Sequence, residues 1–349
     1  MATVSLKSEL PKLAIFGAGG LGIEMVKLLK KRQAANLVAM VDQSGYVFDE
    51  NGLNDEQLIV NSLRAKSIAA IENSVQSSKS ISEFLERNST KIDAIFYALP
   101  NLPNEFIPNI TKEIINQSEF NGVIVDALKR TKAVKMLSEF NSQLQEKNIL
   151  YLTGCGATPG MLTSAAAVAA QSFVEIESVK ITFGVGISNW KAYRATIRED
   201  IAHLKNFNVE KVSQMTEEQI DKELEDRNGI LELVDMEHAD DIMLEMAGIC
   251  DADKVTVGGI VDTRNPQKPV STNVKITGFT YEGKKSTHTF TLGDETTMAA
   301  NVNGTVLGFL NAGVNLHKNY GISGLRTAAE VMPRFNPVKI HKKSLAEII

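Results

Sequence analysis

A glycine-rich turn near the N-terminus constrains the fold of this chain more than any other feature. Residues 17–22 read Gly-Ala-Gly-Gly-Leu-Gly, which has the spacing G-x-G-x-x-G. The apolar run Leu13–Phe16 stands immediately before the turn, and the amphipathic segment Leu21–Lys31 opens within it. In such a strand–turn–helix unit, the first glycine permits the tight turn, the second lets the backbone approach a pyrophosphate, and the third lets the helix pack on the strand. The pattern predicts a Rossmann-type doubly wound parallel sheet that binds a dinucleotide, or, at the least, a plain strand–helix turn.

The residues expected to hold the dinucleotide follow from this turn. An acidic residue is expected about 20 residues after the last glycine, and Asp42 stands there. A carboxylate accepts the ribose hydroxyls and repels a 2′-phosphate, so Asp42 favours NAD, but cations elsewhere could offset one carboxylate and NADP stays open. The apolar strand exit 98–100 either lines the nicotinamide or forms an ordinary turn. The predicted contacts are Gly17, Ala18, Gly19, Gly20, Leu21, Gly22, Asp42, Ala98, Leu99 and Pro100.

The first 155 residues alternate short apolar runs with longer amphipathic segments, which is typical of a parallel sheet covered by helices. The expected strands are Leu13–Phe16, Leu37–Val41, Ile92–Ala98, Val123–Val125 and Leu150–Thr153. The expected helices are Leu21–Lys31, Gln57–Ile71, Ile81–Arg87, Phe106–Gln117 and Thr131–Lys147. This half of the chain is therefore predicted to belong to the α/β class.

Beyond Pro159 the apolar residues alternate with polar ones at period two, which indicates a second, α+β domain on a mainly antiparallel sheet. The expected strands are Glu175–Ile187, Ile230–Val234, Val255–Val261, Thr272–Tyr281 and Ser286–Leu292. The last two meet at Glu282-Gly283-Lys284, which predicts a hairpin. Helices are expected around Tyr193–Lys205 and Thr216–Asp226, and a long helix, Glu295–Lys318, is expected to run back toward the first domain.

The length of 349 residues is enough for two domains with separate cores. We expect a dinucleotide-binding domain over 1–155, a substrate and oligomerisation domain over 156–318, and a C-terminal segment over 319–349 that packs back.

A net charge of −5 gives no overall attraction to nucleic acid or to an anionic membrane. We expect neither a membrane span nor a signal sequence, and the chain has only two cysteines. The cytoplasm is therefore expected, and a homo-oligomer stays open.

A cluster of basic residues stands just after the expected strand Val123–Val125. Val123–Val125 is followed closely by Lys129-Arg130-Thr131-Lys132 at the start of the next helix. The helix macrodipole disfavours cations at this end. The cluster therefore indicates either a bound anion or an amine whose pKa is lowered so that it acts as a nucleophile. Lys129, nearest the strand, is the candidate nucleophile, and the alternative is a solvated basic helix start that binds the cofactor phosphate or nothing.

The expected strand Leu150–Thr153 ends in a second glycine-rich turn, Gly154–Gly160. Its backbone can approach a ligand closely. Cys155 within this turn is a candidate proton donor or acceptor beside the nicotinamide. A free cysteine is more often a small buried hydrophobic residue, and we favour that interpretation.

Two groups of charged residues in the second half are further candidates. Arg194 and Arg198 lie four residues apart, hence on one face of a helix, and could clamp a substrate carboxylate. The adjacent acids Glu199 and Asp200 allow the alternative of surface ion pairs. The segment Glu237–Asp241 contains metal-ligand residue types, but its spacing fits no familiar metal motif. We predict no metal site and an exposed helix start at that segment.

Several of these segments together resemble a known family. The turn Gly17–Gly22, the strand exit VDALKRTKAV (Val125–Val134) and the loop GCGATPG (Gly154–Gly160) resemble the saccharopine dehydrogenase-like oxidoreductases. Three further segments are similar to the cyanobacterial single-turnover 8-amino-7-oxononanoate carboxylating dehydrogenases of biotin synthesis. These are FGVGISNWKAYRATIREDIAHL (Phe183–Leu204), MEHADDIMLEMAGICD (Met236–Asp251), and STNVKITG with STHTFTLGDETTMAANVNG (within Ser271–Gly304). The resemblance covers roughly Leu13 to Phe335.

The resemblance implies that a lysine of the enzyme is consumed. In that family the lysine condenses with the C7 ketone of the substrate, and a nicotinamide hydride reduces the imine. Carbon dioxide or bicarbonate carboxylates the 8-amine, and oxidation on the lysine side followed by hydrolysis leaves the lysine nitrogen on the product. The residue that matches this lysine is Lys129. The implied product is a 7,8-diaminononanoate carbamate, each molecule acts once, and NADH and NADPH both stay open.

Two alternatives to this interpretation remain. One is a multiple-turnover imine reductase similar to saccharopine or carboxynorspermidine dehydrogenase, in which Lys129 is only an acid–base group. The other is a non-catalytic dinucleotide-binding sensor whose second domain meets a partner.

Overall fold

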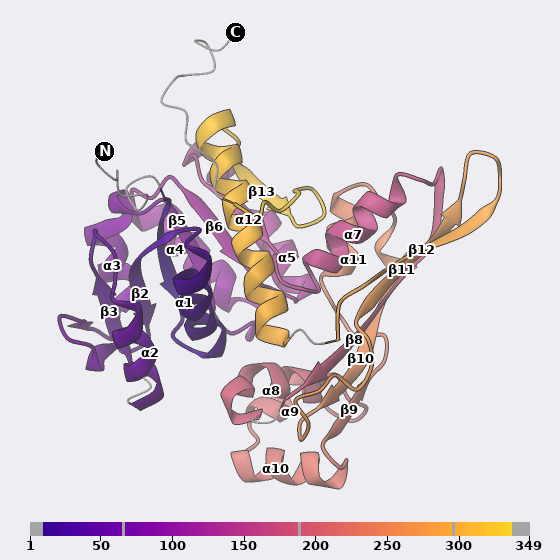
Figure 1. The fold of residues 1–349 in the computed structure, drawn as a ribbon, viewed down its shortest axis with the longest axis horizontal. Helices are drawn as coiled ribbons and strands as arrows, with labels where there is room; N and C mark the ends of the chain where they lie inside the picture. Colours follow the sequence, from indigo (N-terminus) through magenta and orange to yellow (C-terminus); the bar gives the residue numbers. More distant parts are fainter. Residues whose placement is uncertain (1–9, 65–66, 188–189, 295–296, 337–349) are drawn as a thin grey trace.

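The first layer of the molecule is a sheet of eight strands in the order β13-β7-β6-β5-β1-β2-β3-β4 (Figure 1). The computed structural model describes residues 10–64, 67–187, 190–294 and 297–336. The pairs from β13 to β2 are parallel, and β3 and β4 add an antiparallel edge. The strands are β1 (Lys12–Phe16), β2 (Asn36–Asp42), β3 (Gly45–Phe48), β4 (Val75–Gln76), β5 (Ala94–Tyr97), β6 (Val123–Asp126), β7 (Leu150–Thr153) and β13 (Gly324–Thr327).

Helices cover both faces of this sheet. One face carries α1 (Gly20–Arg32), α2 (Asp55–Arg64) and α12 (Met298–Tyr320), and the other carries α3 (Ser80–Asn88), α4 (Phe106–Gln117), α5 (Thr131–Ser138) and α6 (Asn141–Glu146). Successive side chains of a strand point to opposite faces. In β1, Leu13 and Ile15 therefore join the core of the first face, whereas Ala14 and Phe16 join the core of the second.

The second layer is a sheet of five strands in the order β12-β11-β8-β10-β9. Its strands are β8 (Glu175–Gly186), β9 (Ile230–Leu233), β10 (Val255–Asp262), β11 (Asn273–Phe279) and β12 (Lys285–Thr291). β8 and β10 pair in parallel, and the other neighbours pair antiparallel. Alternate residues of β8 form one core with the helices α7 (Met161–Ala170), α8 (Arg194–Ala202), α9 (Val209–Ser213), α10 (Glu217–Asp226) and α11 (Asp240–Met246).

The predicted fold class is confirmed, with differences in detail. The five strands predicted in the first half are present, and β11 and β12 form the predicted hairpin around Gly283. The predicted helix Gln57–Ile71 is instead α2 followed by a short 3-10 turn, Ile68–Ala70, with residues 65–66 outside the described part. The predicted helix Thr131–Lys147 is split into α5 and α6, because a turn at Glu139–Phe140 brings Leu144 into the same core as α5.

Further short elements were not predicted. They are the strands β3, β4 and β13 and the 3-10 turns Ser89–Lys91, Trp190–Tyr193 and Ala252–Lys254, none longer than four residues.

The C-terminal part of the chain returns to the first layer (Figure 1). α12 packs against α1, β6 and β7, and β13 pairs with β7 at the edge of the first sheet. The long helix is confirmed, although residues 295–296 of the predicted range lie outside the described part. Val306, Leu310 and Val314 of this helix pack into the first core, so the helix runs back to the first layer. The predicted domain limits stay predictions.

Candidate active site

The glycine-rich turn joins β1 to α1 and fits a dinucleotide. Gly17 has a φ of +110°, and a Cβ there would lie 2.2 Å from the carbonyl oxygen of Ala98. A Cβ on Gly22 would lie 2.0 Å from the carbonyl oxygen of Gly17, so both glycines are required by the turn itself. Gly19 differs, because a Cβ there would meet no described atom within 4 Å. Gly19 is also the N-cap of α1, whose first turn carries no acidic residue, and such a helix N-terminus suits a pyrophosphate.

Asp42 lies at the end of β2, as predicted, but the chain itself already engages its carboxylate. Oδ1 accepts hydrogen bonds from the backbone N–H of Ser44 at 2.8 Å and from its hydroxyl at 2.5 Å. Oδ2 accepts one from the N–H of Ile68 at 3.1 Å. A carboxylate has about four acceptor positions, so contact between Asp42 and a ribose stays a prediction. Ala98–Pro100 follow β5 directly, with Ala98 in contact range of the glycine turn.

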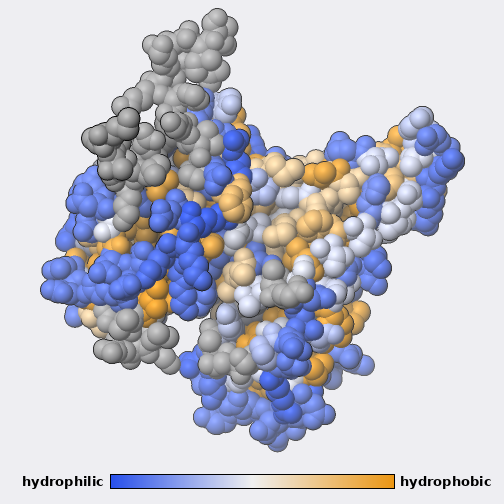
Figure 2. All heavy atoms as spheres, in the orientation of Figure 1, coloured by the Kyte–Doolittle hydropathy of each residue, from blue (hydrophilic) through white to orange (hydrophobic). Residues whose placement is uncertain are grey.

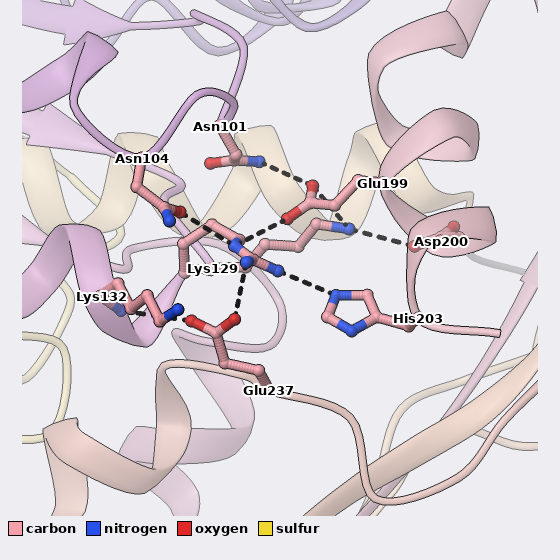
Figure 3. A network of polar contacts seen from close by, with 9 residues as sticks. Asn101, Asn104, Lys129, Lys132, Glu199, Asp200, His203 and Glu237 are labelled. Carbon is pink, nitrogen blue, oxygen red and sulfur yellow. Dashed lines mark hydrogen bonds and ion pairs between the residues drawn. The ribbon is translucent and has the colours of Figure 1, made fainter. Parts of the chain in front are cut away.

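Lys129 lies in the loop between β6 and α5, and two carboxylates of the second layer hold its amine. Its Nζ lies 3.2 Å from Oε2 of Glu199 and 3.2 Å from Oδ1 of Asp200 (Figure 3). Both acids belong to α8, and their side chains are 2% and 5% exposed, against 15% for Lys129. The N–H of Ala239 donates to the carbonyl oxygen of Lys129 at 2.9 Å. The loop is thus fixed by contacts to two separate segments of the second layer.

The charge environment of Lys129 is the opposite of the one predicted. Burial alone would lower the pKa of Lys129, but the nearby carboxylates of Asp200 and Glu199 outweigh it and raise the pKa above the usual lysine value. The prediction of a lowered pKa was wrong because it rested on the adjacent cations, while Asp200 stands 71 residues later in the sequence. The amine is therefore an ammonium in this structure, and it must lose a proton before it can act as a nucleophile.

Arg130, the residue after Lys129, takes part in a second polar network. Its Nη2 lies 2.6 Å from Oε2 of Glu237, and its Nε donates to Oδ1 of Asn104 at 3.2 Å. Its Nη1 lies 3.0 Å from Nε2 of His203. The N–H of Lys132 donates to Glu237 at 3.3 Å. These contacts tie the start of α5 to the loop after β5, to the end of α8 and to the segment before α11.

The ring of His203 is neutral in this network. Burial, together with the positive charges of Arg130 and Lys129 and the neighbouring His238, lowers the pKa of His203 to about 4. A neutral Nε2 can accept the hydrogen bond that Arg130 donates. His203 therefore adds no cation beside Lys129.

A buried carboxylate, Asp126, positions the loops at the ends of β6 and β7. It accepts hydrogen bonds from the N–H of Leu128 at 3.0 Å and of Gly154 at 2.6 Å. It also accepts from the hydroxyls of Tyr151 at 2.7 Å and Thr153 at 3.0 Å. Burial raises the pKa of Asp126. These bonds join the loop that carries Lys129 to the second glycine-rich turn.

Cys155, a predicted catalytic candidate, lies in the first hydrophobic core instead. Its side chain is fully buried, and its thiol donates to the carbonyl oxygen of Leu152 at 3.5 Å. Burial, with a further contribution from the charge of Asp126, raises the pKa of Cys155 well above its usual value. Because a buried, protonated thiol exchanges protons poorly, the structure supports the packing interpretation that we favoured.

The predicted arginine clamp is not formed. Arg194 is exposed, and its Nη1 lies 2.8 Å from Oε1 of Glu217. Nη1 of Arg198 donates to the carbonyl oxygens of Val212 and Met215, both at 2.9 Å. The two guanidinium groups therefore hold α9 and α10 against α8. The neighbouring acids Glu199 and Asp200, whose pairing with these arginines was the alternative to the clamp, contact Lys129 instead.

The segment Glu237–Asp241 is not the exposed helix start that we predicted. His238 and Asp240 are buried, and Nδ1 of His238 lies 2.7 Å from Oδ2 of Asp240. Asp240 also accepts hydrogen bonds from Thr158, at 2.8 Å, and from Thr163. The described residues include no group of three or more metal-ligand side chains that could hold a metal ion.

Sequence reasoning therefore missed the acids of α8 as partners of Lys129, and it missed the asparagines after β5. Asn104 contacts Arg130, and the amide of Asn101 lies 3.5 Å from Oε2 of Glu199. A signal for the asparagines was available, because both follow the strand exit 98–100 that was already expected to face the ligand.

Away from this network, the surface carries one apolar pocket. It lies between α7 and the hairpin β11–β12 and is lined by Met161, Val168, Ile276 and Phe290, among others. Figure 2 shows hydrophobic residues gathered between the first layer and this hairpin, while the outer surfaces are hydrophilic. The pocket contains none of the predicted site residues. Within the described ranges, no helix combines the length and the apolar character needed to cross a bilayer.

Comparisons with known proteins agree with this architecture. The sequence model of the Glutamate/Leucine/Phenylalanine/Valine dehydrogenase family matches residues 1–180. A relative from Haloferax mediterranei, (S)-8-amino-7-oxononanoate synthase BioU, is 41% identical over an alignment 352 residues long, which covers 92% of this chain and 98% of the relative.

Two solved structures share the fold. A DAP dehydrogenase of C. glutamicum in complex with DAP is 16% identical, with a TM-score of 0.55 over 97% of this chain and 98% of that chain. An engineered D-amino acid dehydrogenase bound to NADP+ is 16% identical, with a TM-score of 0.53 over the same shares.

Proposed function

Because the chain belongs to the Glutamate/Leucine/Phenylalanine/Valine dehydrogenase family over residues 1–180 and, over nearly its whole length, to the family of (S)-8-amino-7-oxononanoate synthase BioU, we propose that it is an enzyme of biotin synthesis. In this proposal it is an NAD(P)-dependent oxidoreductase in which Lys129 gives its own amino group to 8-amino-7-oxononanoate. The observation that carries this proposal is the position of Lys129. Its amine lies buried between the two layers, just after the end of β6. In the sheet, β5 stands between β6 and β1, and the dinucleotide turn follows β1.

The first step of the proposed reaction is a proton transfer from Lys129. Glu199 is the proton acceptor, because its Oε2 lies 3.2 Å from Nζ and its buried Oε1 accepts no hydrogen bond from the described residues. The neutral amine then adds to the ketone carbon, the ketone oxygen leaves as water, and an imine forms between Nζ and C7. Burial of the amine between the layers limits the access of bulk water, which would otherwise hydrolyse that imine.

The dinucleotide, when bound, would supply a hydride to the imine carbon while Glu199 returns its proton to the nitrogen, and it would accept a hydride back from the lysine side. The chain contributes the glycine turn that holds the pyrophosphate, and it keeps Lys129 on the strand exit next to Ala98–Pro100. In the proposal, carbon dioxide or bicarbonate carboxylates the 8-amine. Hydrolysis then breaks the bond between Nζ and the lysine carbon, so the nitrogen leaves with the product and the protein keeps an aldehyde. NAD and NADP both remain candidates.

The test uses protein labelled with heavy nitrogen in its lysines. It is incubated with unlabelled 8-amino-7-oxononanoate, bicarbonate and the reduced dinucleotide. We expect at most one equivalent of diamine per protein, with heavy nitrogen in the product and an aldehyde at Lys129 in the peptide masses. Lys132, three residues away, is the internal control and should keep its amine.

Other outcomes would identify other functions. Diamine that exceeds the protein in amount and carries unlabelled nitrogen would identify the multiple-turnover imine reductase. Dinucleotide binding with no hydride transfer would identify the sensor. The relative is named a synthase of 8-amino-7-oxononanoate, whereas our proposal treats this aminoketone as the substrate. The assay decides the direction of the reaction, because it shows whether the aminoketone is consumed or formed. A cytoplasmic location and a homo-oligomer stay predictions.

A further inference from the structure

The charges around Lys129 do not balance. Glu199 and Asp200 are nearly fully buried, and among the described residues the ammonium of Lys129 is the cation that contacts both. Nε of Arg130 lies 3.8 Å from Oε1 of Glu199, but its guanidinium is already paired with Glu237 at 2.6 Å. His203, on the same helix as the two acids, is neutral. The pair therefore carries one more negative charge than the cation that it surrounds.

The imbalance persists when the proposed reaction begins, and it is then concentrated on Asp200. Once the ammonium has given a proton to Glu199 and the amine has condensed with a ketone, the nitrogen is a neutral imine. Asp200 then keeps its charge but has lost its cation. A buried carboxylate without a partner is strongly unfavourable. The site at this stage requires a new cation close to the former position of the ammonium.

We propose that Asp200 binds the ammonium group of the substrate, and that the enzyme thereby selects ketones that carry an amine on the adjacent carbon. This inference rests on the function proposed above. In 8-amino-7-oxononanoate the amine is on C8, next to the ketone carbon C7. After condensation, C7 is bonded to Nζ and the amine is on the adjacent carbon. Asp200 Oδ1 lies 3.2 Å from Nζ, which leaves the neighbouring ammonium within its reach.

The two acids thus have different roles. Glu199 has the buried oxygen Oε1 without a hydrogen bond, which suits a group that takes up a proton. Asp200 makes its contact to Nζ through Oδ1 and is the acid that stays charged. Asp200 is therefore a specificity-determining residue, and its effect should be visible in the choice between ketones.

The test compares two ketones that differ only in the group beside the carbonyl. These are 8-amino-7-oxononanoate and 8-hydroxy-7-oxononanoate, and each is incubated with the full-length protein and cyanoborohydride. Cyanoborohydride reduces an imine on Lys129 to a stable secondary amine without the dinucleotide, and intact mass spectrometry measures the rate of this adduct. We expect the amino ketone to react about 10- to 100-fold faster, which is the range of one charge-assisted contact.

Two variants separate the contact from the reactivity of the ketones themselves. Asp200→Asn keeps the shape of the side chain but removes its charge, and the preference should fall to a few-fold. The absolute rates in this variant change for both ketones, because the lysine loses a neighbour, but the ratio of the two rates does not depend on that change. Asp221→Asn is the matched control. Asp221 lies on α10, where it contacts Trp190 and Lys191, and its loss should leave the ratio unchanged.

The outcomes distinguish this inference from the proposed function. Equal rates for the two ketones in the unmodified protein, or an undiminished ratio in Asp200→Asn, would overturn the role of Asp200 while Lys129 remained the nucleophile. No adduct with either ketone would overturn the proposed function and this inference together.

Discussion

The glycine turn and the cluster around Lys129 belong to one site, but different forces hold them. The turn is a neutral backbone structure within the first layer, fixed by contacts between Gly17, Gly22 and Ala98. The cluster is an arrangement of charges that joins the first layer to the second, through α8 and the segment before α11. The turn needs only its own layer to form. The chemistry of the amine, in contrast, depends on how the second layer docks.

The largest effect that we predict tests this dependence at Lys129. Lys129→Met keeps the length of the side chain but leaves Glu199 and Asp200 buried without their cation. Removing one partner of a buried ion pair costs about 3–5 kcal/mol, so we expect the free energy of unfolding to fall by about that amount, together with loss of all activity. Urea denaturation measures the first effect, and the adduct assay measures the second.

The control for this prediction removes the acids as well. In the triple variant Lys129→Met, Glu199→Gln, Asp200→Asn, most of the lost stability should return, because no uncompensated charge is left. If Lys129→Met were as stable as the unmodified protein, the acids would not be buried against the lysine. The contrast between the glycine turn and the cluster around Lys129 would then disappear.

The second prediction compares two glycines of the turn. Gly17→Ala places a Cβ against the backbone of Ala98 at a positive φ, and we expect a loss of about 1–3 kcal/mol in the free energy of unfolding. Gly19→Ala meets open space, so stability should hold while dinucleotide binding weakens. Chemical denaturation and titration with the reduced dinucleotide separate the two effects. Equal loss of stability in both variants would show that the open space at Gly19 is not there in solution.

These contrasts also explain which parts of the site could be predicted from the sequence. The turn was predictable because only glycine satisfies its backbone geometry, and the exits of β5 and β6 were predictable because the strands are continuous apolar runs. The role of Glu199 and Asp200 was not, because two acids on an amphipathic helix have the same pattern as a solvated face. Only the docking of α8 onto the loop of Lys129 makes them buried.

The same limit accounts for the arginines of α8. Their spacing on one helix face was correct, but the sequence did not show that α9 would offer its carbonyl groups to Arg198. The short strand β13 was missed for a related reason, because it pairs with β7, from which residues 154–323 separate it.

The third prediction distinguishes these two arginines. Arg198→Met removes two hydrogen bonds to backbone carbonyl groups, and we expect a loss of about 1–2 kcal/mol in the free energy of unfolding. Arg194→Met breaks an exposed ion pair with Glu217, for which the expected loss is at most about 1 kcal/mol. Denaturation of both variants at two salt concentrations checks this, since only the exposed pair should respond to salt. A larger loss for Arg194→Met than for Arg198→Met would show that the ion pair with Glu217, and not the contacts of Arg198, holds the helices together.

At neutral pH the smallest effect is expected at His203, because its contribution appears only when the pH falls below about 6.5. The folded protein lowers the pKa of His203 to about 4 from the usual value of 6.5, so between these values the unfolded chain binds more protons than the folded one. Stability should therefore be lost as the pH falls from about 6.5 to about 4. In His203→Gln this part of the loss should vanish, while the amide can still accept the hydrogen bond from Arg130. Urea denaturation of both proteins at several pH values measures the difference, which cancels the contributions of other titrating groups. If the stability of the two proteins differed by the same amount at every pH, the ring of His203 would be solvated. The end of α8 would then pack less closely against Arg130 than Glu199 and Asp200 pack against Lys129.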